Sequence, residues 1–171
     1  MSGKGTPAVD AARRAGIEHV VHEYEHDDSP TSHDRRMSWG LEAAAALGVP
    51  ARRVLKTLVA MVDEGRLVVA VVPVDGEVDL KALAHAVGGR RATLADPADA
   101  QRSTGYVVGG ISPLGQRRPL PTVIDAAALG EPTVFVSGGR RGLDLELAPA
   151  DLVRLTGATV ARIGRSGMEA V

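Results

Sequence analysis

A lysine followed by a threonine interrupts the apolar segment RRVLKTLVAMV at residues 52–62. The chain has only three lysines, so a lysine inside a predicted strand is conspicuous. Side chains alternate along a strand, which puts Lys56 and Thr57 on opposite faces, each otherwise apolar. A buried ammonium without a partner carries a large desolvation cost. We therefore expect either that the strand end opens into a cleft where Lys56 does chemistry, or that its aliphatic stem reaches solvent.

A glycine-rich segment, STGYVVGGISPLG, follows at residues 103–115. Glycine permits close backbone approach, and a turn can direct successive N–H groups at one acceptor, such as the oxyanion of an ester. The alternative is a plain turn between two elements. The segment is not a phosphate-binding P-loop, because Lys and Ser/Thr do not follow the glycines in register.

A second glycine-rich turn lies within VSGGRRGLDLEL at residues 136–147. Ser137 ends one predicted strand and Asp144 begins the next, so the two side chains could face each other across the turn. The alternative is that both side chains cap backbone groups of the turn.

The histidines do not indicate a metal site. His22, Tyr24 and His26 fall on one face of a predicted strand and His19 on the other, whereas zinc needs several converging ligands. Nothing resembles a nucleophile elbow, although spacing alone leaves a Ser-His-Asp triad open. The chain has no cysteine, which excludes a disulfide, a thiolate metal site and a protein thiol nucleophile. We expect neither a metal nor a cofactor.

Arginine occurs in doublets that could contact phosphate. The net charge of −1 provides no general attraction to nucleic acid. Arginine pairs phosphate oxygens bidentately, so converging doublets could form a local phosphate-binding rim, but they could equally be solvated turn residues. The six doublets lie at 13–14, 35–36, 52–53, 90–91, 117–118 and 140–141.

The length of 171 residues, 44% of them hydrophobic, predicts one domain spanning 1–171. No signal sequence or long apolar segment is present, so we expect a soluble cytoplasmic protein without membrane contact. Helices are predicted at 6–15, 39–47, 80–87, 97–104 and 149–156. Strands are predicted at 17–27, 54–62, 67–73, 91–95, 122–129, 133–138, 143–147 and 159–164. Strands outnumber helices without strict alternation, which favours an α+β fold with a twisted or closed mixed sheet and helices outside.

Three segments, in this order, resemble the YbaK/EbsC family, stand-alone relatives of the editing domain of bacterial prolyl-tRNA synthetases. They are VLKTLVAMV, ADPADAQRSTGYVVGGISPLGQRRPLPTVID and VFVSGGRRGLDLEL. TPAV near the start and YEHD at 24–27 fit the same pattern, so the resemblance covers about residues 6 to 165. The form of the central motif is similar to the cysteinyl-tRNA(Pro) deacylase branch.

The resemblance implies an α+β fold with a mixed, barrel-like sheet and flanking helices. It implies hydrolysis of the ester between a wrong amino acid and the acceptor end of tRNA(Pro), without a cofactor. The protein would act in trans beside prolyl-tRNA synthetase, as a monomer or weak dimer.

The resemblance also implies site residues by position. Lys56 and the backbone of Gly109 and Gly110 would be catalytic. The substrate-binding residues would be Tyr24, Trp39, Thr57, Ile111, Ser112, Pro113, Ser137 and Asp144. Two features depart from the family: Trp39-Gly40 stands where Phe-Gly is usual, and the loop at 27–38 is longer.

A proline pocket cannot fully reject cysteine or alanine, because a methylene-sized difference is worth only about 1–3 kcal/mol. Without a protein thiol, the resemblance implies substrate assistance, in which the thiol of the bound cysteine attacks its own ester carbonyl. The alternatives are a deacylase of another mischarged tRNA, such as alanyl-tRNA(Pro), and a non-catalytic module that binds a tRNA end. A third, more distant alternative is a metal-dependent hydrolase whose metal is held by the histidines.

Overall fold

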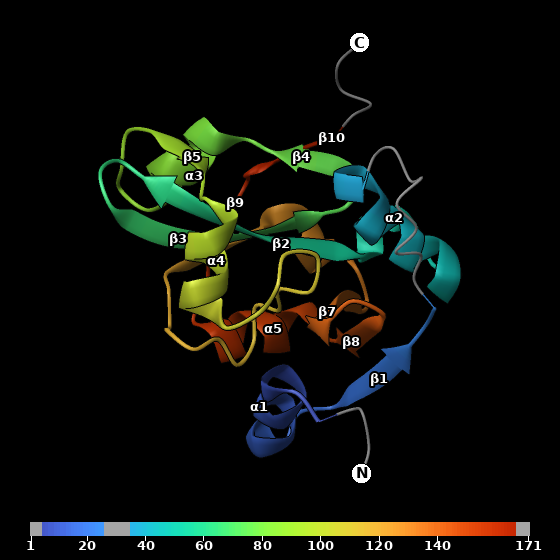
Figure 1. Ribbon diagram of the computed structural model, residues 1–171. Coiled ribbons are helices and arrows are strands. Elements are labelled where there is room, and N and C mark those ends of the chain that lie inside the picture. Colours follow the sequence, from blue (N-terminus) through green and yellow to red (C-terminus); the bar gives the residue numbers. More distant parts are fainter. Residues whose placement is uncertain (1–4, 26–34, 167–171) are drawn as a thin grey trace.

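In the described part of the chain, the strands form three sheets that lie between helices at opposite ends of the molecule. The computed structural model describes residues 5–25 and 35–166. The strands are β1 (His19–Glu23), β2 (Leu55–Val62), β3 (Arg66–Pro73), β4 (Gly76–Val78), β5 (Ala92–Leu94), β6 (Thr122–Asp125), β7 (Val134–Arg140), β8 (Leu143–Leu147), β9 (Thr159–Ala161) and β10 (Gly164–Ser166). The helices are α1 (Pro7–Ala15), α2 (Arg35–Leu47), α3 (Leu80–Ala86), α4 (Pro97–Thr104) and α5 (Pro149–Thr156), with 3-10 turns at Ala51–Arg53 and Ala126–Gly130. Figure 1 shows α3 above the largest sheet and α1 at the far end, below β7 and β8.

The helices begin and end where their local chemistry predicts. The Thr6 hydroxyl accepts a hydrogen bond from the N–H of Val9 at 3.1 Å, and Gly16 ends α1 with φ of 67°. Asp79 caps α3 in the same way, accepting from the N–H of Ala82 at 3.0 Å. The predicted helices are therefore confirmed, although α2 begins earlier, at Arg35.

The five-stranded sheet has the order β5-β2-β3-β6-β9 and is mixed, as expected. The predicted strands β2 and β3 pair as an antiparallel hairpin, whereas β6 runs parallel to β3 and β9 runs parallel to β6. One face of the hairpin belongs to the core cluster that also includes residues of α1 and β8, and the other face belongs to a cluster with residues of α3. The first face carries Leu55, Val59, Val69 and Val71, and the second carries Ala60, Val62, Val68, Ala70 and Val72.

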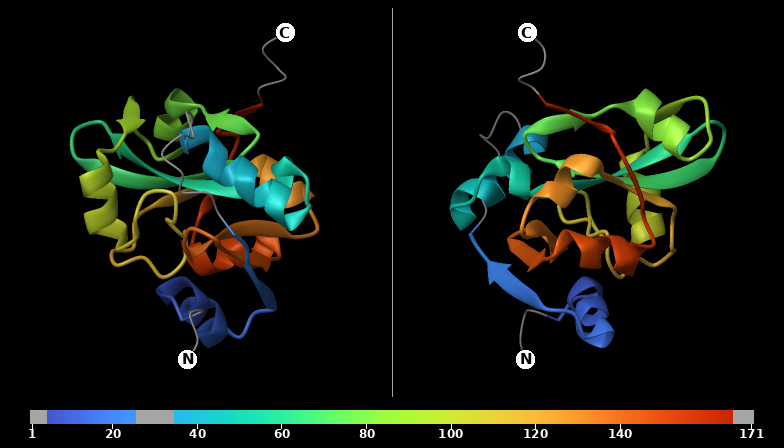
Figure 2. Two further views of the ribbon diagram at one scale, coloured as in Figure 1. Left: turned by 45° about the vertical axis from the view of Figure 1, so that its right-hand side comes forward. Right: turned by 180° about the vertical axis from the view of Figure 1, so that it is seen from behind.

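The three-stranded sheet has the order β1-β8-β7 and is antiparallel throughout. Leu143, Leu145 and Leu147 point from β8 into the main core. The opposite face is partly covered by α2, whose Ala43 and Ala44 pack in a small apolar cluster with Phe135 of β7. Figure 2 shows α2 beside the sheets, away from α1.

The predicted barrel-like closure is wrong, although the α+β class is confirmed. Within the described residues the strands divide into separate sheets, and β7 meets β2 through one isolated bridge, between Val54 and Phe135. A register shift also lies in β7, between Ser137 and Arg140. These irregularities interrupt the ladder that a closed barrel would need.

Two other predictions differ in detail. The strand expected at 122–129 ends at Asp125 and continues as the 3-10 turn. The short antiparallel pair of β4 and β10 was not predicted, because its three-residue strands lie far apart in the chain.

Candidate functional site

The outer face of the three-stranded sheet brings several predicted site residues together. Ser137 of β7 lies directly opposite Asp144 of β8, so the predicted juxtaposition of these two residues is confirmed. His22 of β1 is the other cross-strand neighbour of Asp144, and Tyr24 follows His22 by two residues. Alternation along the strands therefore places Tyr24, Ser137 and Asp144 toward one side, away from the leucines of the core.

Asp144 is a buried carboxyl, with 5% of its surface exposed. The Tyr24 hydroxyl hydrogen-bonds to it. Burial raises the pKa of Asp144 to about 7, and the hydrogen bond from Tyr24 offsets part of that rise. Burial and the nearby charge of Asp144 also raise the pKa of Tyr24 above its usual range. A carboxyl in this state can attract an ammonium group, because a bound cation would favour its charged form.

Ser137 also has a local role in the β7–β8 turn. Its hydroxyl oxygen accepts a hydrogen bond from the N–H of Gly139 at 3.1 Å. Both readings of the sequence therefore hold for this residue, since Ser137 faces Asp144 and also stabilises the turn.

The segment at 107–113 forms a tight turn followed by a buried stretch. The N–H of Gly110 donates to the carbonyl of Val107 at 2.9 Å, and Gly109 has φ of 92°. The N–H of Gly110 is thus already used within the turn. The N–H groups of Gly109, Ile111 and Ser112 donate to no acceptor in the part of the chain that the structure describes.

The side chains after the two glycines are buried. Ile111 packs in the main core, and Pro113 is also buried. The Ser112 hydroxyl accepts from the N–H of Leu114 at 3.2 Å. The predicted contribution of this stretch to substrate binding would therefore come from its backbone.

The two glycine-rich turns lie against each other. A Cβ atom on Gly110 would lie 2.8 Å from the Cα of Arg140 in the β7–β8 turn. A Cβ atom on Gly109 would lie 2.6 Å from Nε of Arg141 and 2.9 Å from Cε3 of Trp39. The predicted residues Trp39, Gly109 and Gly110 therefore meet. Arg141, which the sequence analysis named only as part of an arginine doublet, lies against Trp39 and Gly109.

Lys56 and Thr57 lie on opposite faces of β2, as their alternation predicts. Lys56 shares its face with Val54, which packs beneath α2, and with Leu58, which packs on the side of α3. Burial lowers the pKa of the half-buried Lys56, and the negative charges of Glu77 and Asp75 oppose that change. Lys56 thus lies beside the apolar cluster under α2 that also includes Tyr24.

Thr57 faces the main core rather than the cluster under α2. Its hydroxyl oxygen is buried and has no hydrogen-bond partner among the described residues. Its neighbours on that face, Leu55 and Val59, belong to the same core cluster as Ile111. A buried hydroxyl without a partner is costly, so it could serve a group that enters from outside.

A polar network that the sequence analysis did not predict adjoins Asp144 on the same face. Glu146 accepts from the Thr133 hydroxyl at 2.6 Å and lies 2.9 Å from Nε2 of His22 and 3.6 Å from Nη2 of Arg53. The hydrogen bond from Thr133, together with His22 and Arg53, lowers the pKa of Glu146. The alternation in LDLEL places Glu146 on the same face as Asp144, so this pattern could have predicted that Glu146 adjoins the site.

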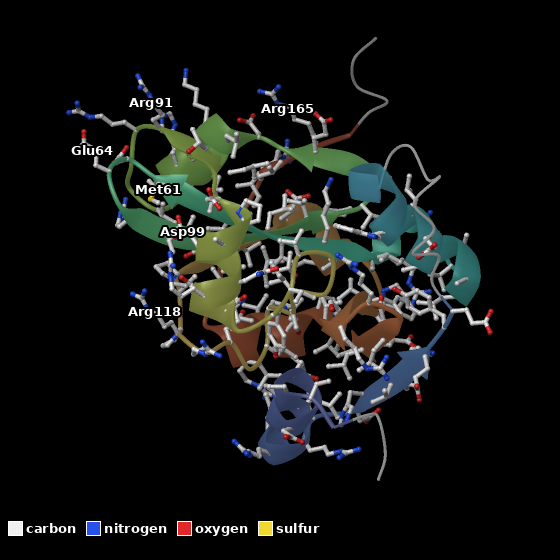
Figure 3. The ribbon with its side chains drawn as sticks, in the orientation of Figure 1. Met61, Glu64, Arg91, Asp99, Arg118 and Arg165 are labelled. Carbon is white, nitrogen blue, oxygen red and sulfur yellow. The ribbon has the colours of Figure 1, made fainter. Side chains whose placement is uncertain are left out.

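The arginine doublets lie in different places. Arg52 pairs with Glu131 at 3.1 Å, and Arg140 pairs with Glu23 at 3.4 Å. Figure 3 shows Arg91 and Arg118 at the edge opposite α2, so their doublets do not join the one at 140–141 in a single rim.

Some candidate features do not contribute to this site. The described residues hold no group of three potential metal ligands, while His26 and His33 lie outside them, as do residues 27–34 of the long loop. A hollow of about 720 Å³ between the start of β1 and α5 holds none of the predicted site residues. Its lining comprises residues 16–20, Thr133, 146–148, Asp151 and Arg154. In the described parts of the chain, no helix has the length and apolar character to span a membrane.

Comparison with known proteins identifies the family. The aminoacyl-tRNA editing domain matches residues 36–155. EbsC of Enterococcus faecalis, whose name proposes a Cys-tRNA(Pro)/Cys-tRNA(Cys) deacylase, is 38% identical over 120 residues, covering 70% of this chain and 73% of that protein. A proline–tRNA ligase of Acidithiobacillus ferrooxidans is 32% identical over 89 residues, which are 52% of this chain and 15% of the ligase.

A solved structure supports the same relationship. The crystal structure described as a proposed trans-editing enzyme for prolyl tRNA synthetase superposes with a TM-score of 0.78 at 28% identity. The match covers 96% of this chain and 99% of the other. The predicted resemblance is therefore confirmed, and the chain belongs to the aminoacyl-tRNA editing domain family.

Proposed function

We propose that this protein is a trans-editing deacylase that removes cysteine from cysteinyl-tRNA(Pro). The observation that carries the proposal is the buried Tyr24–Asp144 pair on the face partly covered by α2, a helix that also reaches the Gly109–Gly110 turn. A buried carboxyl can bind the α-ammonium of an amino acid, and N–H groups beside it can bind an ester carbonyl. The proposed name of EbsC supports the same substrate.

The nucleophile is the thiol of the substrate. The chain has no cysteine, and the hydroxyls of Ser112 and Ser137 accept backbone N–H groups of their own turns. The cysteine sulfur attacks the ester carbonyl, the bond from that carbon to the ribose oxygen breaks, and the thiol proton passes to the leaving ribose oxygen. Water then opens the resulting cyclic thioester. The protein contributes mainly by holding the thiol and the carbonyl together.

Each site residue contacts a different group of the substrate. Asp144 and Tyr24 hold the α-ammonium group, while the N–H groups of Gly109 and Ile111 stabilise the developing oxyanion. Lys56, which is half-buried beside the negative charges of Glu77 and Asp75, binds the terminal ribose-phosphate or the reacting ester. Ser137 lines the pocket beside Asp144, and Trp39 forms its mouth. The Thr57 hydroxyl would meet the substrate from the opposite face of β2.

Prolyl-tRNA synthetase is the proposed partner. The net charge of −1 and the dispersed arginine doublets favour weak intrinsic affinity for tRNA. A complex with the synthetase would raise the effective concentration of the mischarged acceptor end.

Hydrolysis of cysteinyl-tRNA(Pro) and alanyl-tRNA(Pro) by the wild type and by Lys56→Ala tests the proposal. We expect rapid loss of cysteine only, slowed by about 100-fold or more in the variant, because a positioned charge is removed from the reacting ester. Loss of alanine instead would show that the substrate is alanyl-tRNA(Pro). If the protein hydrolysed neither aminoacyl-tRNA, the proposed deacylase activity would be contradicted. Lys81→Ala is the matched control, since Lys81 is exposed on α3.

A further inference from the structure

The side chain of Arg141 joins two segments that are distant in the sequence. Its guanidinium carbon lies 4.3 Å from the centre of the Trp39 ring of α2, which is cation–π distance. Its Nη2 donates to the carbonyl of Val108 at 2.6 Å. One guanidinium from the β7–β8 turn therefore holds the start of α2 and the turn at 107–110 together.

The glycines of this turn make the arrangement possible. Both Arg141 and Trp39 approach Gly109 so closely that a Cβ atom would lie under 3 Å from each of them. Gly110 packs equally closely on the backbone of Arg140 and Arg141. Such packing leaves the turn little freedom, so its orientation depends on the side chains that surround it.

We propose that Arg141 is a positioning residue that holds Trp39 and the 107–110 turn as one wall of the active site. By accepting from Arg141, the carbonyl of Val108 is directed away from the substrate. The N–H of Gly109 lies opposite this carbonyl on the same trans peptide, so it is directed toward the substrate. This inference rests on the proposed deacylase, in which that N–H group meets the ester.

The alternative role of Arg141 is a direct contact with a tRNA phosphate, and the experiment must distinguish it from the positioning role. A phosphate contact depends mainly on charge, which lysine retains. The stack on Trp39 and the hydrogen bond to Val108 depend on a planar guanidinium, which lysine lacks. Arg141→Lys therefore distinguishes the two roles, and Arg141→Ala removes both.

Arg140→Ala is the matched control. Arg140 is the other member of the doublet and carries the same charge, but its guanidinium pairs with Glu23 of β1. The three variants are first compared with the wild type by thermal unfolding, and rates are expressed per folded molecule.

The kinetic readout is kcat and KM on cysteinyl-tRNA(Pro). We expect Arg141→Ala and Arg141→Lys to lower kcat by about tenfold or more, with KM changed by less than about threefold, because the wall is misplaced while phosphate contacts persist. Arg140→Ala should retain kcat within about twofold. Wild-type kcat in Arg141→Lys, or a raised KM with a weaker dependence on salt, would overturn the proposal in favour of a phosphate contact.

Fluorescence provides a readout that does not depend on catalysis. The chain has one tryptophan, so emission quenching by acrylamide reports on Trp39 alone. Quenching should increase in both Arg141 variants and stay unchanged in Arg140→Ala. Unchanged quenching in Arg141→Ala would overturn the proposal, even if the wild type proved inactive and the proposed deacylase failed.

Discussion

Two buried aspartates, Asp125 and Asp144, have nearly the same exposure and opposite surroundings. Asp125, at the end of β6, is 4% exposed, and its Oδ1 accepts from the N–H groups of Ile163 and Gly164, each at 3.0 Å. Asp144 is 5% exposed, and among the described residues it receives no backbone N–H, but only the hydroxyl of Tyr24. One carboxyl is satisfied by the fold, whereas the other is satisfied only in part.

The difference distinguishes a structural carboxyl from a candidate binding group. Asp125 fixes the segment that leads into β10 against the sheet, so its partners belong to the folded chain itself. Asp144 lacks such partners and has its pKa raised to about 7 by burial. A buried polar group that the fold leaves incompletely satisfied is rare, and a role in binding or catalysis is one explanation for it.

The largest expected effect is on catalysis at Asp144. Asp144→Asn should lower the rate of cysteinyl-tRNA(Pro) hydrolysis by about 100-fold or more, because a neutral amide cannot pair with the α-ammonium group. Single-turnover kinetics measure this rate. Asp125→Asn is the control and should keep the wild-type rate per folded molecule. If the rate fell equally in Asp144→Asn and Asp125→Asn, the assignment of Asp144 alone to substrate binding would be wrong.

The next effect is on stability at Asp125. Asp125→Ala should lower the free energy of unfolding by about 1–3 kcal/mol or more, since it leaves at least the buried N–H of Ile163 without an acceptor. Asp125→Asn should cost less, because one carbonyl oxygen can still accept both N–H groups. Urea unfolding measures the difference. Equal stability of Asp125→Ala and the wild type would show that the hydrogen bonds from Ile163 and Gly164 to Asp125 do not stabilise the fold.

A separate effect on stability is its pH dependence at Asp144. Its pKa is about 7 in the folded protein, against an ordinary value of 3.8, so the folded state binds more protons between these values. The stability that this proton uptake provides is fully present below about pH 4 and is lost as the pH rises through about 7. Asp144→Asn does not titrate, so it should gain stability relative to wild type between about pH 5 and about pH 8. A difference that does not change with pH would contradict the raised pKa.

The fold was largely predictable where local chemistry decides it. The helices that Thr6 and Asp79 cap and the two strands β2 and β3 are determined by residues close in sequence, and each of these elements was predicted. The pairing of β4 with β10 was not, because two three-residue strands carry little periodicity and their contact is long-range. The barrel was inferred from resemblance, and sequence patterns do not reveal whether a sheet closes.

The site was predictable to the extent that strand alternation places its residues. Alternation predicted that Lys56 and Thr57 diverge, and the spacing around the turn suggested that Ser137 and Asp144 face each other. Neither pattern could reveal that Arg141, rather than Arg140, would lie against Trp39, because that depends on how α2 packs beside two loops. Glu146 was missed because it was considered only as part of an alternating strand.

Tyr24 lies directly after β1, and β1 is an edge strand that pairs with β8 alone among the described strands. It also lies outside residues 36–155, the part that matches the editing domain family. An edge strand can be exchanged while the sheet behind it keeps its hydrogen bonds and its core. In the deacylase proposed above, Tyr24 supplies one wall of the substrate pocket, so the N-terminal segment is a natural place to graft a new amino-acid preference.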